Sequence, residues 1–210
     1  SISISETSGV ANNDGIICTG SSATLTASGG VSYLWNTGAV TDVITVNSTG
    51  NYIVTVTDAL GCASSSAVTI TVNPTPTVSI AVSENSGDSP NDGVLCSGAS
   101  AMLTASGGGT YLWSTGATIN QIVSSMTGTY IVTVTSNGCV ASTSTNITVN
   151  PLPTAGITVA EMSGLTDNDG VICSGSSALL TASGGSTYLW SNAQTTPLIN
   201  VSTEGSYVVT

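Results

Sequence analysis

Cysteines and acidic side chains are the only residues of this chain whose types could do covalent or metal chemistry. The 210 residues include five Cys and eleven Asp or Glu, but no Lys, Arg or His. A nucleophilic thiol needs a neighbouring base, and zinc sites need His or closely spaced Cys pairs, neither of which occurs. We therefore expect the cysteines to form disulfides, which implies an oxidising compartment.

The cysteines recur with a fixed period. Cys18, Cys96 and Cys173 are spaced by 78 and 77 residues, and Cys62 and Cys139 by 77. One disulfide within each repeat is the economical pairing, Cys18 with Cys62 and Cys96 with Cys139, although sequence alone does not prove connectivity. The partner of Cys173 would then lie near position 216 or 217, beyond the last residue. Closing a loop of this length should contribute about 3–4 kcal/mol to each domain.

The acidic residues gather in a loop that occurs three times, as "ETSGVANNDG", "ENSGDSPNDG" and "EMSGLTDNDG". Carboxylate and amide oxygens in a Gly-rich loop suit Ca²⁺, which takes six to eight oxygen ligands. The candidate calcium ligands are Asp14, Asp92, Asp167 and Asp169. The alternative, which we favour, is that Asn-Asp-Gly is a turn, because Gly accepts positive φ and Asp or Asn bonds the local backbone. We therefore expect no cofactor, and the alternative is that these loops bind Ca²⁺.

All three tryptophans stand in one phrase, "SYLWNTGA", "TYLWSTGA" and "TYLWSNAQ". A Trp on a central strand can fill the space between two sheets, since one ring buries about 150–250 Å². We expect Trp35, Trp113 and Trp190 to be core residues, together with Tyr52, Tyr130 and Tyr207, each of which follows a Gly-containing turn. The competing interpretation is an exposed Trp on which a sugar stacks.

The elements that must position these residues are strands. Short alternating segments rich in Val, Ile and Thr, separated by Gly- and Asn-containing turns, recur at roughly ten-residue intervals, a spacing typical of an antiparallel sandwich. In the first repeat we expect strands over residues 1–6, 23–28, 32–35, 43–46, 52–57 and 67–72. No segment shows the 3.6-residue period of a helix.

The repeat period predicts three domains, at residues 1–76, 77–153 and 154–210. The third repeat has no counterpart of the segment at residues 61–72, so its last strand is missing. We expect the natural chain to continue; the alternative is that a neighbouring subunit donates the strand. The links "VNPTPT" and "VNPLPT" should act as semi-rigid spacers, because Pro fixes φ and extends the residue before it.

The composition of the chain excludes several functions. With a net charge of −11 and no cation, the chain cannot neutralise nucleic-acid phosphates. No run of 18 apolar residues exists, so no membrane insertion is expected. Without His, Lys or a paired thiol and base, the chain is not expected to be an enzyme.

The phrases "YLWSTGAT", "GTYIVTVT", "NGC" and "TVNPLP" resemble the immunoglobulin-like or PKD-like repeats of very large surface proteins of Bacteroidota. These include SprB-type gliding-motility adhesins and related proteins exported by type IX secretion. The resemblance covers nearly the whole chain, three times over. It implies tandem immunoglobulin-like β-sandwich domains joined head-to-tail, at the bacterial cell surface.

Two functions follow from these observations. The first is a structural repeat region, a stalk or filament of an extracellular adhesin or motility fibre. Its partners would be neighbouring repeats of the same chain and other copies in a filament. The alternative is an adhesive module whose loops bind surface glycans or Ca²⁺.

Overall fold

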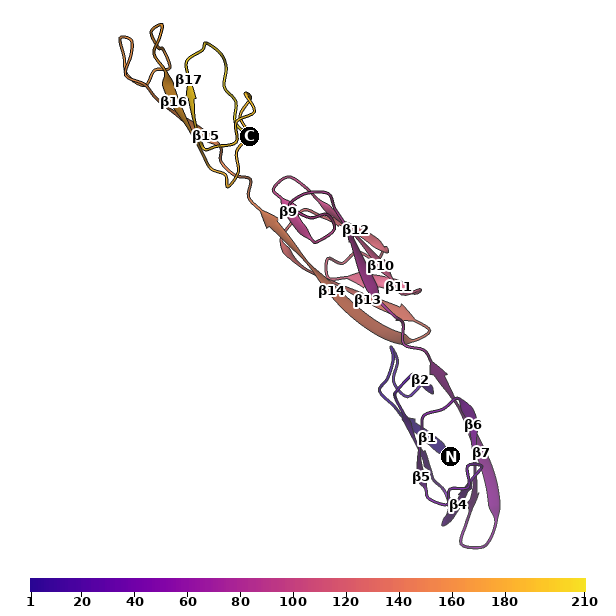
Figure 1. Ribbon diagram of the computed structural model, residues 1–210. Coiled ribbons are helices and arrows are strands. Elements are labelled where there is room, and N and C mark those ends of the chain that lie inside the picture. Colours follow the sequence, from indigo (N-terminus) through magenta and orange to yellow (C-terminus); the bar gives the residue numbers. More distant parts are fainter. The chain divides into compact units, whose positions relative to one another are not determined.

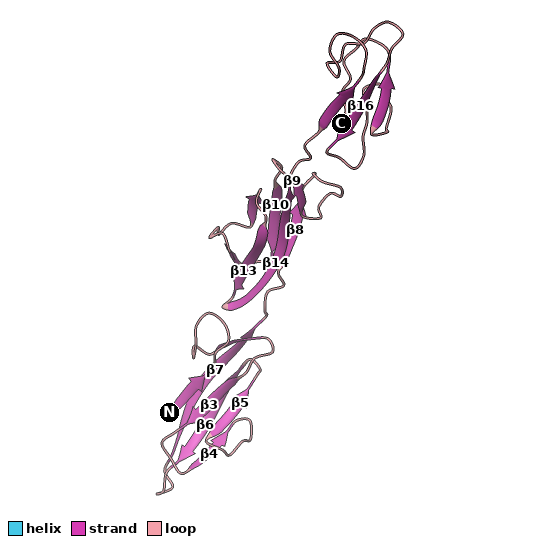
Figure 2. Ribbon diagram, turned by 90° about the vertical axis from the view of Figure 1, so that its left-hand side faces the viewer, coloured by secondary structure: helices cyan, strands magenta, loops and turns pink.

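The computed structural model describes all 210 residues and contains strands but no helix (Figures 1 and 2). No element could therefore cross a membrane as a long apolar helix. We keep the names first, second and third repeat for residues 1–76, 77–153 and 154–210. The strands of the first repeat are β1 (Ile2–Ser5), β2 (Ile16–Cys18), β3 (Ala23–Ala27), β4 (Ser32–Trp35), β5 (Val43–Val46), β6 (Gly50–Thr57) and β7 (Ala63–Asn73).

The second repeat contains the same seven strands in the same order, and the third repeat contains three. Those of the second are β8 (Ser79–Ser83), β9 (Val94–Cys96), β10 (Ala101–Ser106), β11 (Thr110–Trp113), β12 (Gln121–Ser124), β13 (Gly128–Ser136) and β14 (Cys139–Asn150). Those of the third are β15 (Gly156–Ala160), β16 (Ala178–Ser183) and β17 (Leu198–Val201).

Each of the first two repeats is built from two sheets. A three-stranded sheet has the order β1-β3-β5 in the first repeat and β8-β10-β12 in the second. A four-stranded sheet has the order β2-β7-β6-β4 in the first and β9-β14-β13-β11 in the second. The pairings are antiparallel except for β2 with β7 and β9 with β14, which are parallel. The sequence pattern did not predict β2, β9 or these parallel pairs.

Alternation along the strands explains why one face of each sheet is buried. In β3, Ala23, Leu25 and Ala27 are buried, while the Thr residues between them are partly exposed. Side chains of a strand point alternately to the two faces of its sheet, so this pattern places every second residue between the layers. The same alternation occurs in β10 and β16.

The tryptophans lie at the centre of three separate hydrophobic clusters, one in each repeat. Trp35, Trp113 and Trp190 are exposed by only 1, 2 and 1 %. Each indole Nε1–H donates a hydrogen bond of 2.9 Å to the carbonyl oxygen of the residue six positions later. The rings of Trp35 and Trp113 therefore lie between two sheets, and all three rings are too buried to serve as a platform for a sugar.

The tyrosines that follow the Gly-containing turns tie their strands to the preceding loop. Tyr52 is buried, and Tyr130 and Tyr207 are half-buried. Each hydroxyl donates a hydrogen bond to a main-chain carbonyl four residues earlier, at 2.9 Å in the first repeat and 3.0 Å in the other two. This geometry matches the tyrosine corner of immunoglobulin-like sandwiches.

Contacts divide the chain into two compact units, Ser1–Asn150 and Pro151–Thr210. The first and second repeats lie in the same unit because they share a junction, described below. The division expected from the repeats, with borders after residues 76 and 153, remains a prediction.

Candidate functional site

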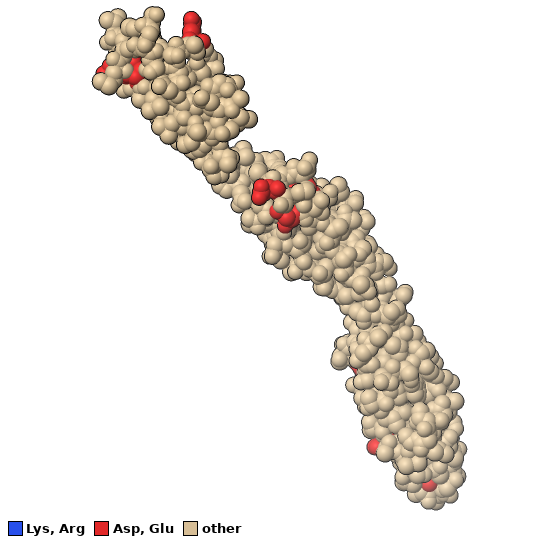
Figure 3. Space-filling model, viewed as in Figure 1, with Lys and Arg blue, Asp and Glu red and all other residues tan.

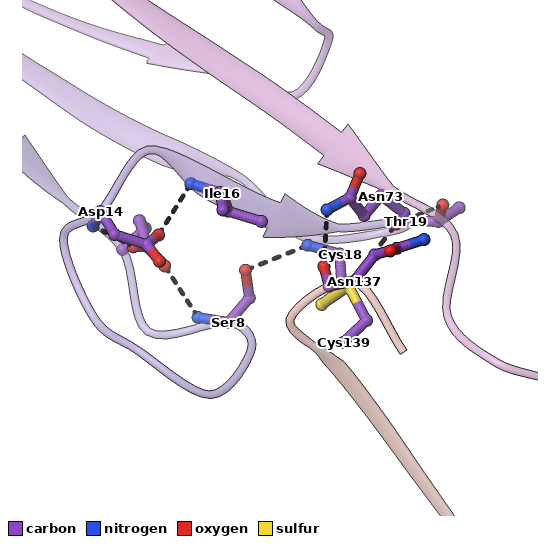
Figure 4. The surroundings of a disulfide bond; sticks show 9 residues. Ser8, Asp14, Ile16, Cys18, Thr19, Asn73, Asn137 and Cys139 are labelled. Atoms are coloured by element: carbon purple, nitrogen blue, oxygen red, sulfur yellow. Dashed lines mark hydrogen bonds between the residues drawn. A yellow bond between two sulfur atoms is a disulfide. The ribbon is translucent and has the colours of Figure 1, made fainter. Parts of the chain in front are cut away.

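The one disulfide of the structure joins the first repeat to the second. Cys18, the last residue of β2, is bonded to Cys139, the first residue of β14 (Figure 4). Their Cα atoms lie 5.7 Å apart, although 121 residues separate them in the sequence. The distance is within the range that disulfides need.

The expected pairing within each repeat is wrong. Cys62, the proposed partner of Cys18, is an exposed free thiol, and Cys96, the proposed partner of Cys139, is also free. The reason is the parallel pairing of β2 with β7, which places Cys18 beside Asn73 at the end of β7. Cys62 precedes the first residue of β7, so about 33 Å of extended strand separates it from Cys18. A disulfide cannot span that distance.

Cys18 is held in place by its own repeat. Its main-chain N–H donates to the Ser8 hydroxyl at 3.2 Å (Figure 4). The next residue, Thr19, donates its main-chain N–H to the carbonyl oxygen of Asn73 at 2.9 Å. These bonds hold Cys18 between the acidic loop and the end of β7.

Cys139 is positioned by a tight hairpin. Asn137 and Gly138 form the two-residue turn between β13 and β14, with φ values of 48° and 78°. Asn-Gly is the preferred pair for such a turn because both central residues need positive φ. The turn forms a narrow tip of the second repeat, and Cys139 is the residue that follows it directly.

Two hydrogen bonds join this tip to the first repeat beside the disulfide. Val10 donates its main-chain N–H to the carbonyl oxygen of Gly138 at 2.9 Å. The side-chain amide of Asn73 donates to the carbonyl oxygen of Asn137 at 2.6 Å. A Cβ at Gly9 would come within 2.6 Å of the Gly138 oxygen, so the close approach also requires a glycine at position 9.

A buried glutamate organises each acidic loop. Glu6, Glu84 and Glu161 are exposed by only 3, 7 and 4 %. In every repeat the two carboxylate oxygens accept main-chain N–H groups two and eight residues later, at 2.8–3.1 Å. The carboxylates therefore accept hydrogen bonds from the main chain of their own loop.

These hydrogen bonds affect the acidity of two of the glutamates. The N–H of Ser86 is the main cause that lowers the pKa of Glu84 from its ordinary value of 4.5, and burial opposes the shift. The N–H of Ser163 lowers the pKa of Glu161 in the same way. Both side chains therefore favour the ionised form in the folded chain.

The candidate calcium ligands lie in turns. Asp14, Asp92 and Asp169 each accept, at 2.8 Å, the main-chain N–H of the residue two positions later, and Asp167 is exposed. The Asn before each of these three has φ between 61° and 64°, as expected for a turn. No group of three or more His, Cys, Asp or Glu side chains could hold a metal ion. Figure 3 shows the acidic groups as small patches on a surface that has no Lys or Arg.

The third repeat has an open groove where the other two have their last strand. Its volume is about 600 Å³, and it is lined by apolar side chains including Ile157, Ile172, Leu180 and Tyr207. In the first and second repeats, Ile70 of β7 and Ile147 of β14 are buried in the corresponding clusters. Cys173 lines this groove and is exposed, and its N–H donates to the Ser163 hydroxyl at 3.3 Å.

No family model and no curated protein matches the chain. Similar solved structures include murine CEACAM1b, with 11 % identity and a TM-score of 0.38 over 71 % of this chain and all of that one. The titin Z1Z2 domains in complex with telethonin have 16 % identity and a TM-score of 0.29 over 65 % of this chain and 92 % of that one. A Ca²⁺-stabilized adhesin that helps an Antarctic bacterium bind ice has 19 % identity and a TM-score of 0.37. It matches all of this chain, which spans 65 % of the adhesin chain.

The similarity to these structures concerns the fold and says nothing about activity. The strand order, the two-sheet core and the tyrosine corner define the chain as an all-β protein of immunoglobulin-like β-sandwich domains. In addition, a disulfide joins its first two repeats.

Proposed function

We propose that this chain is a structural repeat region of an extracellular bacterial adhesin or motility fibre, in which consecutive sandwich domains are joined by disulfides. The observation that carries the proposal is the Cys18–Cys139 bond, which links two repeats and not two strands of one repeat. Such a bond contributes to the connection between domains, which is the property that a load-bearing tether needs.

The composition supports an extracellular location at the bacterial cell surface. A disulfide persists in oxidising compartments, and a chain without Lys or Arg offers no site for trypsin-type proteases. The resemblance of the repeat phrases to Bacteroidota surface adhesins, including gliding adhesins exported by type IX secretion, supports the finer assignment. The proposed role requires no catalytic residue.

Stretching single molecules by their two ends tests the mechanical role. The disulfide bypasses the residues between positions 18 and 139, so they cannot extend under force while it is intact. The fully unfolded chain should therefore be shorter by about 400 Å in oxidising buffer than in reducing buffer. The variant Cys139→Ser should give the long form in both buffers, and equal lengths for the unmodified chain would contradict the proposal.

The alternative, an adhesive module that binds glycans or Ca²⁺, predicts different results. Glycan arrays would show retention of the intact chain, and a chelator would lower the unfolding temperature. For a structural repeat region, we expect no glycan retention and the same unfolding temperature with and without chelator.

A further inference from the structure

The cysteines fall into two structural classes. Those that come first in each repeat, named here the leading cysteines, each donate their main-chain N–H to a serine hydroxyl ten residues earlier, at 3.2–3.3 Å. They are Cys18, Cys96 and Cys173. Those that follow a Gly at the tip of the last hairpin, named here the hairpin cysteines, are Cys62 and Cys139. The observed bond joins one member of each class across two repeats.

The site around Cys96 reproduces the main-chain pairing and the main-chain N–H hydrogen bonds of the site around Cys18. Cys96 lies beside Asn150 in the parallel pair of β9 with β14, as Cys18 lies beside Asn73. Ser97 donates its N–H to the carbonyl oxygen of Asn150 at 2.8 Å, as Thr19 does to Asn73 at 2.9 Å. The Cys96 thiol is free and half-buried, whereas bonded Cys18 is buried.

We infer that Cys96 is a second cross-linking site, which takes the Gly-Cys tip of a β-hairpin from another repeat of this kind. Asn150 would bond the main chain of that tip, as Asn73 bonds Asn137. Leading cysteines then pair with hairpin cysteines of the following repeat, and pairs within one repeat or one class do not form. This rule extends the proposed function, and the stretching experiment on Cys18–Cys139 does not depend on it.

The bond forms by thiol–disulfide exchange with a small disulfide such as oxidised glutathione. One protein thiolate attacks a sulfur of the small disulfide and releases one glutathione thiol, which leaves a mixed disulfide. The second protein thiolate displaces the other glutathione. Two protein thiols thus lose two protons and two electrons, and one glutathione disulfide becomes two thiols.

A graft provides the direct test. Residues 134–150 of the second repeat, which include its hairpin tip and all of β14, are appended after Thr210 and supply the third repeat with a last strand and a hairpin cysteine. After oxidation in glutathione buffer, we expect peptide mapping to find Cys96 bonded to the grafted cysteine and protected from alkylation. A bond from the grafted cysteine to Cys173, or a Cys96 that remains alkylated, overturns the inference.

A matched pair of substitutions in the natural β14 of the grafted chain distinguishes a docking site from chance oxidation. Asn150→Ala in the natural β14 removes the amide equivalent to that of Asn73 and should slow formation of the Cys96 bond. Asn146→Ala, in the same strand but away from this end, should leave the rate unchanged. Equal rates for the two variants would show that no docking precedes the bond and would overturn the inference.

A second arm shows whether the hairpin can also come from another copy of the chain. One variant keeps only Cys62 as a free thiol (Cys96→Ser, Cys173→Ser), and the other keeps only Cys96 (Cys62→Ser, Cys173→Ser). If another copy of the chain can supply the hairpin tip, the yield of the Cys62–Cys96 heterodimer should exceed that of either homodimer at least about tenfold. For a two-electron couple this ratio corresponds to a difference in reduction potential of about 30 mV. Homodimers that form in the same yield as the heterodimer would contradict the rule that leading cysteines pair with hairpin cysteines.

Discussion

The side-chain amide of Asn73 donates a hydrogen bond to the main-chain carbonyl of Asn137, 64 residues later in the sequence. Asn73 is the last residue of β7, and Asn137 is in the turn that precedes β14. The contact therefore joins the end of one sandwich to the tip of the next without using the disulfide. Covalent and non-covalent links act at the same place, and they can be separated by mutation.

Removing the disulfide should lower the stability of the unit Ser1–Asn150. In the chain-entropy model a closed loop of this length contributes about 5 kcal/mol, and measured losses are typically about 2–5 kcal/mol. We expect Cys139→Ser to lower the free energy of unfolding in urea by an amount in that range. Cys62→Ser, which changes an exposed free thiol, should alter it by less than about 0.5 kcal/mol. Equal losses in the two variants would instead favour pairing within the repeat.

The hydrogen bond from Asn73 should matter most when the disulfide is absent. Asn73→Ala in the Cys139→Ser background leaves the Asn137 carbonyl without this donor, and we expect a further loss of about 0.5–1.5 kcal/mol. Thermal or urea unfolding of the single and double variants measures the difference. No further loss in the double variant would mean that the hydrogen bond from Asn73 contributes nothing to the junction.

Acid should destabilise the loop that contains Glu84. The pKa of Glu84 is lowered in the folded chain by the N–H of Ser86, and it returns to about 4.5 on unfolding. The unfolded chain therefore binds a proton at higher pH, and the stability due to this carboxylate, complete above about pH 4.5, is lost as the pH falls through the lower folded-state pKa. Glu84→Gln should reduce stability at neutral pH and flatten its acid dependence. Glu204→Gln, at an exposed carboxylate, is the control and should leave the stability at neutral pH unchanged.

The tryptophan at the centre of each cluster should dominate the stability of its repeat. Trp113→Ala removes a ring that is 2 % exposed, and such changes cost about 3–5 kcal/mol. Leu112 is the adjacent residue of β11, on the opposite face, and it is 54 % exposed. Leu112→Ala should therefore have a small effect in the same urea titration. A loss at Leu112 as large as that at Trp113 would show that the outer face of this sheet is covered.

The open groove of the third repeat should accept a strand with the sequence of β14. A peptide of residues 139–150 offers Ile147, which is 1 % exposed in the second repeat, to the groove lined by Ile157 and Leu180. We expect the peptide to slow amide hydrogen exchange in β15–β17 and at residues 205–210 of the intact chain. A peptide with Asp in place of Ile147 should not protect these amides, and equal protection by both would contradict strand insertion.

Much of the fold could be predicted because its signals are local. Alternation of apolar and polar residues marked most strands, and the recurring Trp35 phrase marked the period. The junction could not be predicted, because Cys18 reaches the end of its domain through the parallel pair of Ile16 with Thr71, 55 residues apart. A three-residue strand inside a polar loop has no period of its own, so β2 gave no signal. Without that strand, a separation of 44 residues suggested that Cys18 and Cys62 were neighbours, although they lie at opposite ends of β7.

The position of Cys139 also fixes the order in which the chain can mature. All strands of the first repeat precede residue 74, so its sandwich can close while Cys18 still lacks a partner. That partner is made 121 residues later. In a chain that folds from its N-terminus, closure of this bond therefore lags behind the folding of the first repeat. A closed bond at Cys18 shows that the chain of the second repeat has been made at least as far as residue 139.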